Sequence, residues 1–398
     1  MMDSTSSNEE IAVFSLGPAV AALVYPGSLY FFHESVRIFH SANHIYVSAI
    51  ALITAVLSLS LAYVVPAFSF VAAYALGTRD HPSRQSEEAR LLAHLAFSSP
   101  PLFTAIGVLC FLLHAPRADY LVWLLLWIAL GVLAVRRSRS AALPKRSRST
   151  PVRVRMIHGI SALAILLVFL VGHMANHVVG IWNLAGDIEV MNVLRTIYRA
   201  QWLQPEIVGL FVFQIVSGLV LLGSRMTRKT DLFGVLQTTS GMYLATFLIS
   251  HMTAVFVLGR IVLKVDTNDA WAAGLPAGMV ADLWNTRLIP HYSLAAFLLI
   301  AHLGCGLRGI LLDHAWSRSV SNRITAVITG IGAAVATVII LALLGVHLRG
   351  GLKAPTWPQP GARSVIGPQT PARPIKQLPP LPVRRALVQA DMSRYFTG

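Results

Sequence analysis

Four histidines of this sequence lie well inside long apolar runs: His94, His173, His251 and His302. Ionisable side chains are uncommon within membrane-spanning segments and usually have a function there. A neutral imidazole in such a position either hydrogen-bonds to a neighbouring helix or ligates a metal, in particular a haem iron. For any single histidine the two interpretations are equally open, so the relative positions of the histidines must decide between them.

Two of these histidines are predicted to lie at the same depth in the membrane. At a helical rise of ~1.5 Å per residue, His251 is ~14 Å from Arg260, and His173 is ~14 Å from Trp182. Both helices are predicted to run from the inside to the outside, so the two imidazoles share one level in the outer half. That arrangement suits a haem iron ligated by imidazoles from both faces. His302 lies ~9 Å from the inner end of its own helix and therefore belongs to another level.

Small residues accompany these histidines, namely Gly172, Ser240, Gly241, Gly304 and Gly306. Small side chains let a flat macrocycle approach the helix backbone closely. They are equally common wherever two membrane helices pack together, and helix packing is the simpler interpretation.

The composition requires a membrane environment for these elements. Of 398 residues, 55% are hydrophobic and only 12% are charged, whereas soluble domains carry roughly 25% charged residues. A soluble globular protein and a largely disordered chain are both excluded. The net charge of +15 resides mostly between apolar runs and in the tail, so it indicates membrane orientation and not nucleic-acid binding. The two cysteines, Cys110 and Cys305, exclude a disulfide scaffold, a CxxC zinc site and a cysteine-ligated iron–sulfur cluster.

The sequence predicts an all-α polytopic membrane protein with about nine transmembrane helices in contact with the lipid bilayer. A bilayer core of ~30 Å needs about 20 helical residues per span. The candidate spans are 11–32, 46–77, 91–114, 119–135, 156–180, 205–224, 235–260, 289–312 and 324–347. Pro66 allows a kink in the second span, and Pro100-Pro101 predict a bend in the third.

Charge distribution predicts the orientation and divides the chain. The stretch 136–155 carries eight Lys or Arg and no acid, which predicts a cytoplasmic location, an internal N-terminus and an external C-terminus. The predicted units are a four-span unit at 1–140, a basic cytoplasmic linker at 141–155, a five-span cytochrome-b-like unit at 156–348, and a Pro-rich basic tail at 349–398. The tail is predicted to be disordered. Its basic charge favours the cytoplasmic side, whereas nine spans place it outside.

Three motifs occur in order within the five-span unit, and they include His173, His251 and His302. They are GISALAILLVFLVGHMANHVVGIWNLAGD (159–187), LQTTSGMYLATFLISHMTAVF (236–256) and AHLGCGLRGI (301–310). With these motifs the unit resembles the membrane-anchor cytochrome b of bacterial succinate dehydrogenases and fumarate reductases, of the single-chain, five-helix type.

The resemblance implies a function and a cofactor. In that family four histidines on the first four helices bind two b haems, and electrons pass between quinone and partner flavoprotein and iron–sulfur subunits. Carried over, His173 and His251 are the ligands of the distal haem near the outer face. His302 is one ligand of the proximal haem. The setting implied is the bacterial cytoplasmic membrane.

One departure from the family limits this expectation. The segment 205–224 contains no histidine, although the family ligand should fall near Ser217 to Leu219. His158 is a candidate substitute, but an interfacial histidine beside the basic linker is the simpler interpretation. The sequence therefore predicts one haem b, a second site in doubt, and quinone or a partner protein as electron exchange partner. Spanning ~30 Å of bilayer without a relay would make electron transfer very slow.

The loss of that ligand and the four additional spans leave an alternative function open. On the same scaffold the chain would be a non-enzymatic membrane sensor or assembly module. A transporter is disfavoured because no inverted repeat and no paired intramembrane charges occur. No dehydrogenase or phosphate-binding motif occurs, so hydride or dicarboxylate chemistry would have to lie on partner chains.

The other histidines have mainly structural interpretations. His177, one turn beyond His173, and His291 are each either contacts of a haem propionate or quinone or interfacial side chains, the latter favoured for His177. His33, His40 and His44 could share one helical face and bind a metal, but a solvated amphipathic loop is favoured. For His94 the simple expectation is a hydrogen bond to backbone groups that the nearby prolines free.

Overall fold

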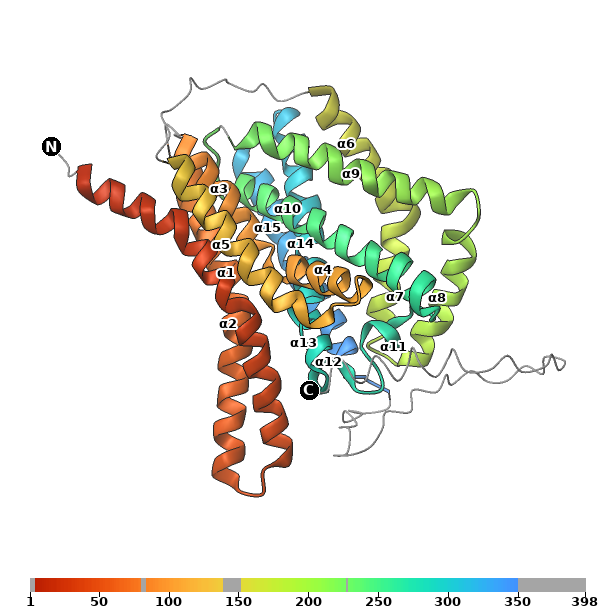
Figure 1. Ribbon diagram of the computed structural model, residues 1–398. Coiled ribbons are helices and arrows are strands. Elements are labelled where there is room, and N and C mark those ends of the chain that lie inside the picture. Colours follow the sequence, from red (N-terminus) through yellow and green to blue (C-terminus); the bar gives the residue numbers. More distant parts are fainter. Residues whose placement is uncertain (1–3, 80–83, 139–151, 227, 350–398) are drawn as a thin grey trace.

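The computed structural model describes residues 4–79, 84–138, 152–226 and 228–349 (Figure 1). Most of the predicted basic linker and all but the first residue of the predicted Pro-rich tail lie outside the described residues. Every regular element in the described part is helical.

The helices follow one another with short connections. The first unit contains α1 (Ser4–Ser41), α2 (Ile45–Gly77), α3 (Arg84–Phe97), α4 (Ser99–Leu112), η1 (Pro116–Ala118) and α5 (Asp119–Ser138). The second unit begins with α6 (Val152–Ile165), η2 (Leu166–Leu170), α7 (Val171–Val179), α8 (Leu184–Tyr198), α9 (Leu203–Arg225), α10 (Leu232–Met252) and η3 (Thr253–Leu263). It ends with α11 (Asp269–Ala272), α12 (Gly278–Ala281), α13 (Leu283–Thr286), α14 (Leu288–Asp313) and α15 (Arg318–Leu343).

The apolar helices identify an all-α polytopic membrane protein. Among the described residues seven helices are long and apolar enough to cross a membrane, and the pair α3 and α4 makes an eighth if it is one span. That pair bends by 66° where Pro100 and Pro101 follow the break, which confirms the predicted bend. The remaining predicted span, 11–32, lies within α1. Only 17–39% of each apolar window is buried inside the protein, which leaves many apolar side chains for contact with lipid.

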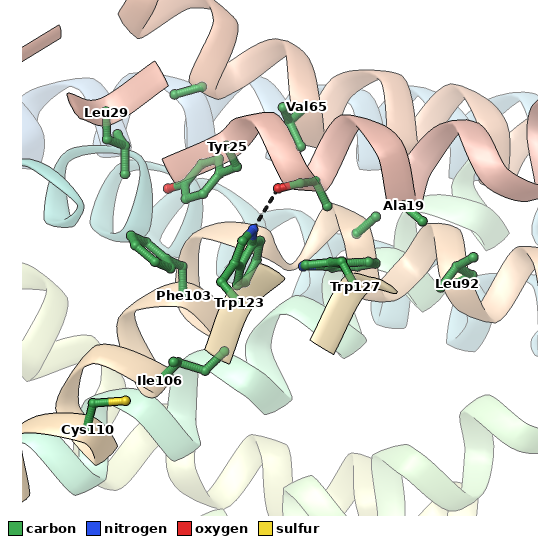
Figure 2. Close-up of a cluster of buried hydrophobic side chains, with 13 residues drawn as sticks. Ala19, Tyr25, Leu29, Val65, Leu92, Phe103, Ile106, Cys110, Trp123 and Trp127 are labelled. Atoms are coloured by element: carbon green, nitrogen blue, oxygen red, sulfur yellow. Dashed lines mark hydrogen bonds between the residues drawn. The ribbon is translucent and has the colours of Figure 1, made fainter. Parts of the chain in front are cut away.

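The first unit packs around a group of aromatic side chains. Trp123 and Trp127 of α5 are buried against Tyr25 of α1 and Phe103 of α4, and the rings meet edge-on or tilted (Figure 2). The indole Nε1 of Trp123 donates to the carbonyl oxygen of Ala22 at 2.8 Å. A buried indole N–H needs such an acceptor, and the small buried side chain at position 22 lets the ring approach the α1 backbone. The α1–α2 hairpin extends beyond this core (Figure 1).

The two units pack against each other through buried polar contacts. Arg90 of α3 donates to two carbonyl oxygens in the turn between α9 and α10, at 3.0 and 3.1 Å. His94 lies 3.0 Å from the hydroxyl of Thr239 on α10, so its partner is this side chain in the other unit. Arg287 donates to Asp119 at 2.8 Å within the interface. The first unit is therefore a packing partner of the histidine-bearing helices.

Two helices of the second unit depart from α geometry beside their histidines. The π-helical turn η2 lies between α6 and α7, directly before the turn that carries His173. The π-helical segment η3 begins two residues after His251. Such segments are rare and often occur at functional sites. They alter which side chains the two helices direct toward their neighbours.

Candidate functional site

A large apolar cavity lies within the second unit. Its volume is about 1330 Å³, and it is lined by side chains of α6, η2, α7, α8, α9, α10, η3, α11, α14 and α15. Ligand pockets typically measure about 300–1,000 Å³, so this cavity has room for a bulky cofactor or for more than one. His158, His173, His251 and His302 all line it.

His173 of α7 and His251 of α10 both line the cavity and lie close to each other. Their ring centroids are 6.4 Å apart. Metal–imidazole bonds are about 2.0–2.1 Å long, so two imidazoles bound to one metal from opposite sides have centroids about 6 Å apart. The structure thus brings together the two side chains that the sequence predicted at one level. We refer to them as the α8-end pair, because α7 leads into α8 at that end of the bundle.

Each ring of the α8-end pair is held by a phenylalanine one helical turn earlier. Phe169 stacks on His173 with centroids 4.8 Å apart, and Phe247 stacks on His251 with centroids 5.2 Å apart. Residues four apart lie on the same face of a helix. The sequence signal is the repeated pattern Phe-Leu-X-X-His, FLVGH at 169–173 and FLISH at 247–251, which the sequence reasoning missed.

The ring nitrogens of His251 are available for a ligand. Within the described part of the chain no hydrogen bond reaches either of them. The Nε2 atom of His173 lies 3.3 Å from Nε2 of His177. His177 in turn places Nδ1 3.0 Å from the carboxylate of Asp269. His177 is therefore a half-buried neighbour of the α8-end pair and not a solvated interfacial side chain.

His302 of α14 faces the same cavity at another level, together with His158 of α6. His158 Nδ1 lies 2.7 Å from the hydroxyl of Ser217, which itself donates to a carbonyl. His302 Nδ1 lies 3.1 Å from the backbone carbonyl of Gln237 and 2.9 Å from the hydroxyl of Ser240. A carbonyl only accepts, so Nδ1 of His302 carries the proton and Nε2 keeps its lone pair. Metal-binding histidines are commonly oriented by such a bond on their other nitrogen.

We refer to His158 and His302 as the α6-end pair. Ser217 lies where the resemblance to the cytochrome b family predicts a histidine on α9, and its hydroxyl hydrogen-bonds to the ring of His158 from α6. His158, which the sequence suggested as an interfacial histidine, thus lines the cavity. The signal in the sequence is the 15-residue spacing of His158 and His173 within one apolar run.

The small residues near the histidines have different roles. A Cβ atom on Gly241 would lie 3.1 Å from the ring of His302, so this glycine gives the imidazole its space. A Cβ on Gly304 would instead lie 2.9 Å from Ile328 of α15, which is helix packing. Gly241 thus makes room for a histidine ring that lines the cavity, and Gly304 makes room for a neighbouring helix.

Arginines lie at both ends of the cavity. Arg195, Arg199 and Arg260 line it near the α8-end pair, and Arg155 and Arg225 line it near the α6-end pair. Guanidinium groups bind carboxylates in a fixed, bidentate geometry. A cofactor with anionic substituents would find counter-charges at either end.

Among the described residues, the remaining histidines do not line the cavity. His291 is buried, leaves Nδ1 without a partner, and packs on Phe247 with centroids 4.7 Å apart. Across the described ranges, His33, His40 and His44 form no three-ligand group suited to a metal.

No protein-family model, curated protein or solved structure matches this chain. The function of the chain is therefore inferred from the cavity and the side chains that line it.

Proposed function

We propose that the chain is an integral membrane b-type cytochrome that binds a haem between His173 and His251. The observation that carries the proposal is the 6.4 Å separation of the two imidazoles within an apolar cavity of about 1330 Å³. Two imidazoles of this kind are the axial ligands of many b-type haems.

The bound haem would supply one-electron redox chemistry, while the protein supplies position and electrostatics. His173 and His251 would hold the iron. Phe169 and Phe247 fix the planes of the imidazoles by stacking. The arginines at the cavity ends provide counter-charges for propionates, and the apolar walls exclude water.

A second haem between His158 and His302 would complete a path along the bundle. Both rings have Nδ1 occupied by a hydrogen bond and Nε2 free for a metal. His158 and His173 are 15 residues apart on one continuous span, which corresponds to ~22 Å at helical rise. Electrons would then pass between the two ends in two steps instead of one long one. Quinone and a redox partner subunit are the proposed electron donor and acceptor.

The experiment is a reduced-minus-oxidised absorption spectrum with haem counted per purified chain. The expected result is a b-type spectrum with two haems in the wild type and one in His251→Ala or His302→Ala. His314→Ala is the control, because His314 is exposed and its Nδ1 bonds only to its own helix backbone.

Three other outcomes would contradict parts of the proposal. Full haem content in His251→Ala would remove the α8-end pair as ligands. One haem in the wild type, lost only in His251→Ala, would limit the protein to the α8-end site. No haem at all would overturn the cytochrome and favour the sensor or assembly role on the same scaffold.

A further inference from the structure

Three segments that are distant in sequence meet at the α8 end of the bundle. They are the last turn of α7, the first turn of α8 and the first residue of α11, and the three labelled helices lie in the same region of Figure 1. They contribute His177, Asp187 and Asp269, each with one nitrogen or oxygen atom within 4.8 Å of the others. These side chains belong neither to the α8-end pair nor to the α6-end pair.

The two carboxylates of this cluster lack a cationic partner. Asp187 is fully buried and Asp269 is 6% exposed. In the described part of the chain neither pairs with Lys or Arg, and the one partner of Asp269 with a basic ring is His177, whose Nδ1 is 3.0 Å from each carboxylate oxygen. Buried charges in proteins are normally paired or coordinate a metal.

Two further acceptor atoms at this cluster have no donor among the residues that the structure describes. The Oδ2 atom of Asp187 is buried without a partner, and so is the Oδ1 atom of Asn176. Asn176 is 3% exposed, and its Nδ2 donates to Asp187 Oδ1 at 2.7 Å, so its amide group lies against the cluster. Leaving buried polar atoms unsatisfied is destabilising. A cation bound here would satisfy several acceptors at once.

We propose that His177, Asp187 and Asp269 bind one divalent transition-metal ion, with Zn²⁺ as the best match. One imidazole nitrogen and carboxylate oxygens form a donor set that Zn²⁺ accepts. The Oδ1 atom of Asn176 or a water is the fourth ligand. Four ligands held tetrahedrally at about 2.0–2.2 Å from one ion are about 3.3–3.6 Å apart, so atoms that now lie within 4.8 Å of one another would move together by about 1 Å on binding.

The ion would have a structural consequence for the cavity. It would tie α7, α8 and α11 together and fix the ring of His177, whose Nε2 lies 3.3 Å from Nε2 of His173. The site adjoins the α8-end pair but uses none of the proposed haem ligands, so it does not depend on the proposed cytochrome function.

A shared proton is the competing explanation for the carboxylate pair. Burial and the neighbouring Asp269 carboxylate raise the pKa of Asp187 to about 7, so a protonated Asp187 could donate to Asp269. The two explanations differ in metal content and in their response to a chelator.

The experiment uses the full-length protein in detergent and measures metal per chain by mass spectrometry. The expected result is one equivalent of Zn²⁺ in the wild type, and at least a tenfold lower content in Asp187→Asn. EDTA should lower the Tm of the wild type, and added Zn²⁺ should restore it, because a ligand that binds only the folded state stabilises it. Asp266→Asn is the control, since Asp266 lies nearby but is exposed and pairs with Arg195.

The Asp187→Asn variant is expected to fold, because the change is isosteric and removes repulsion between two carboxylates. Its Tm should be insensitive to EDTA and to Zn²⁺. His177→Gln provides a second variant with the same expected insensitivity. Wild-type protein without bound metal, and without any change of Tm on adding EDTA, Zn²⁺ or Mn²⁺, would overturn the metal site and leave the shared proton.

Discussion

The ion pair between Asp119 and Arg287 joins the two units of the chain, so its removal tests their packing. Nη2 of Arg287 donates to Asp119 Oδ2 at 2.8 Å, and the two side chains are 4% and 3% exposed. The guanidinium also lies 4.4 Å from the centroid of the Phe103 ring. Asp119→Asn would leave the arginine buried without its counter-charge.

The expected loss can be estimated from this geometry. Removing one partner of a buried ion pair costs about 3–5 kcal/mol, since the other charge stays in an apolar environment. An unfolding entropy of about 2.1 cal/mol/K per residue gives roughly 0.8 kcal/mol/K for 398 residues, which corresponds to a fall in Tm of about 4–6 °C. A membrane protein keeps much of its helical structure on unfolding, so its unfolding entropy is smaller. The same loss of free energy then lowers Tm by more.

The assay is thermal unfolding of the full chain in one detergent, followed by near-ultraviolet circular dichroism. Asp119→Asn, Arg287→Met and the double variant form a cycle, in which the double variant should lose less than the sum of the two single losses. Glu34→Gln is the control, because the Glu34–Arg37 pair is largely exposed and such pairs contribute about 0–1 kcal/mol. Single losses that simply add, or a Tm unchanged in Asp119→Asn, would refute the reasoning.

Three further predictions concern single side chains. Gly107→Ala should lower Tm, because its Cβ would overlap the same guanidinium, whereas Gly131→Ala, which meets nothing within 4 Å, should not; equal Tm values would contradict this. Gly241→Ala should shift the spectrum or reduce the content of a haem at the α6-end pair, because the new Cβ presses on the ring of His302 at 3.1 Å; an unchanged spectrum with two haems counts against it. A backbone N–H and two arginines lower the pKa of Asp231 despite its burial. Asparagine keeps the N-cap acceptor, so Asp231→Asn removes mainly the attraction to Arg308 and Arg318 and should cost up to about 1 kcal/mol at pH 7. The difference should shrink as the pH falls below the ordinary carboxyl pKa and vanish below the lowered pKa of the folded state, and a pH-independent difference in Tm would argue against the ion pairs.

Much of the architecture follows from the sequence alone. Apolar runs of about 20 residues predict membrane helices because a lipid-exposed backbone must satisfy its own hydrogen bonds. The bend at Pro100 follows from a ring that cannot continue the helix. The equal depth of His173 and His251 follows from a constant rise per residue, and their rings do meet in the cavity.

Other features required the tertiary structure, because they depend on contacts between distant segments. Sequence spacing could not reveal that Ser217 on α9 holds His158 toward the cavity, since this contact joins two helices 59 residues apart. Nor could it reveal that Asp187 and Asp269 meet at His177, because each acid by itself resembles an ordinary polar residue in a loop. The sequence by itself determined which segments are long and apolar enough to cross a membrane, and it predicted one common level for His173 and His251. The packing of helices decided which imidazoles and carboxylates face one another, because that choice depends on rotation and approach of whole helices and not on their hydrophobicity.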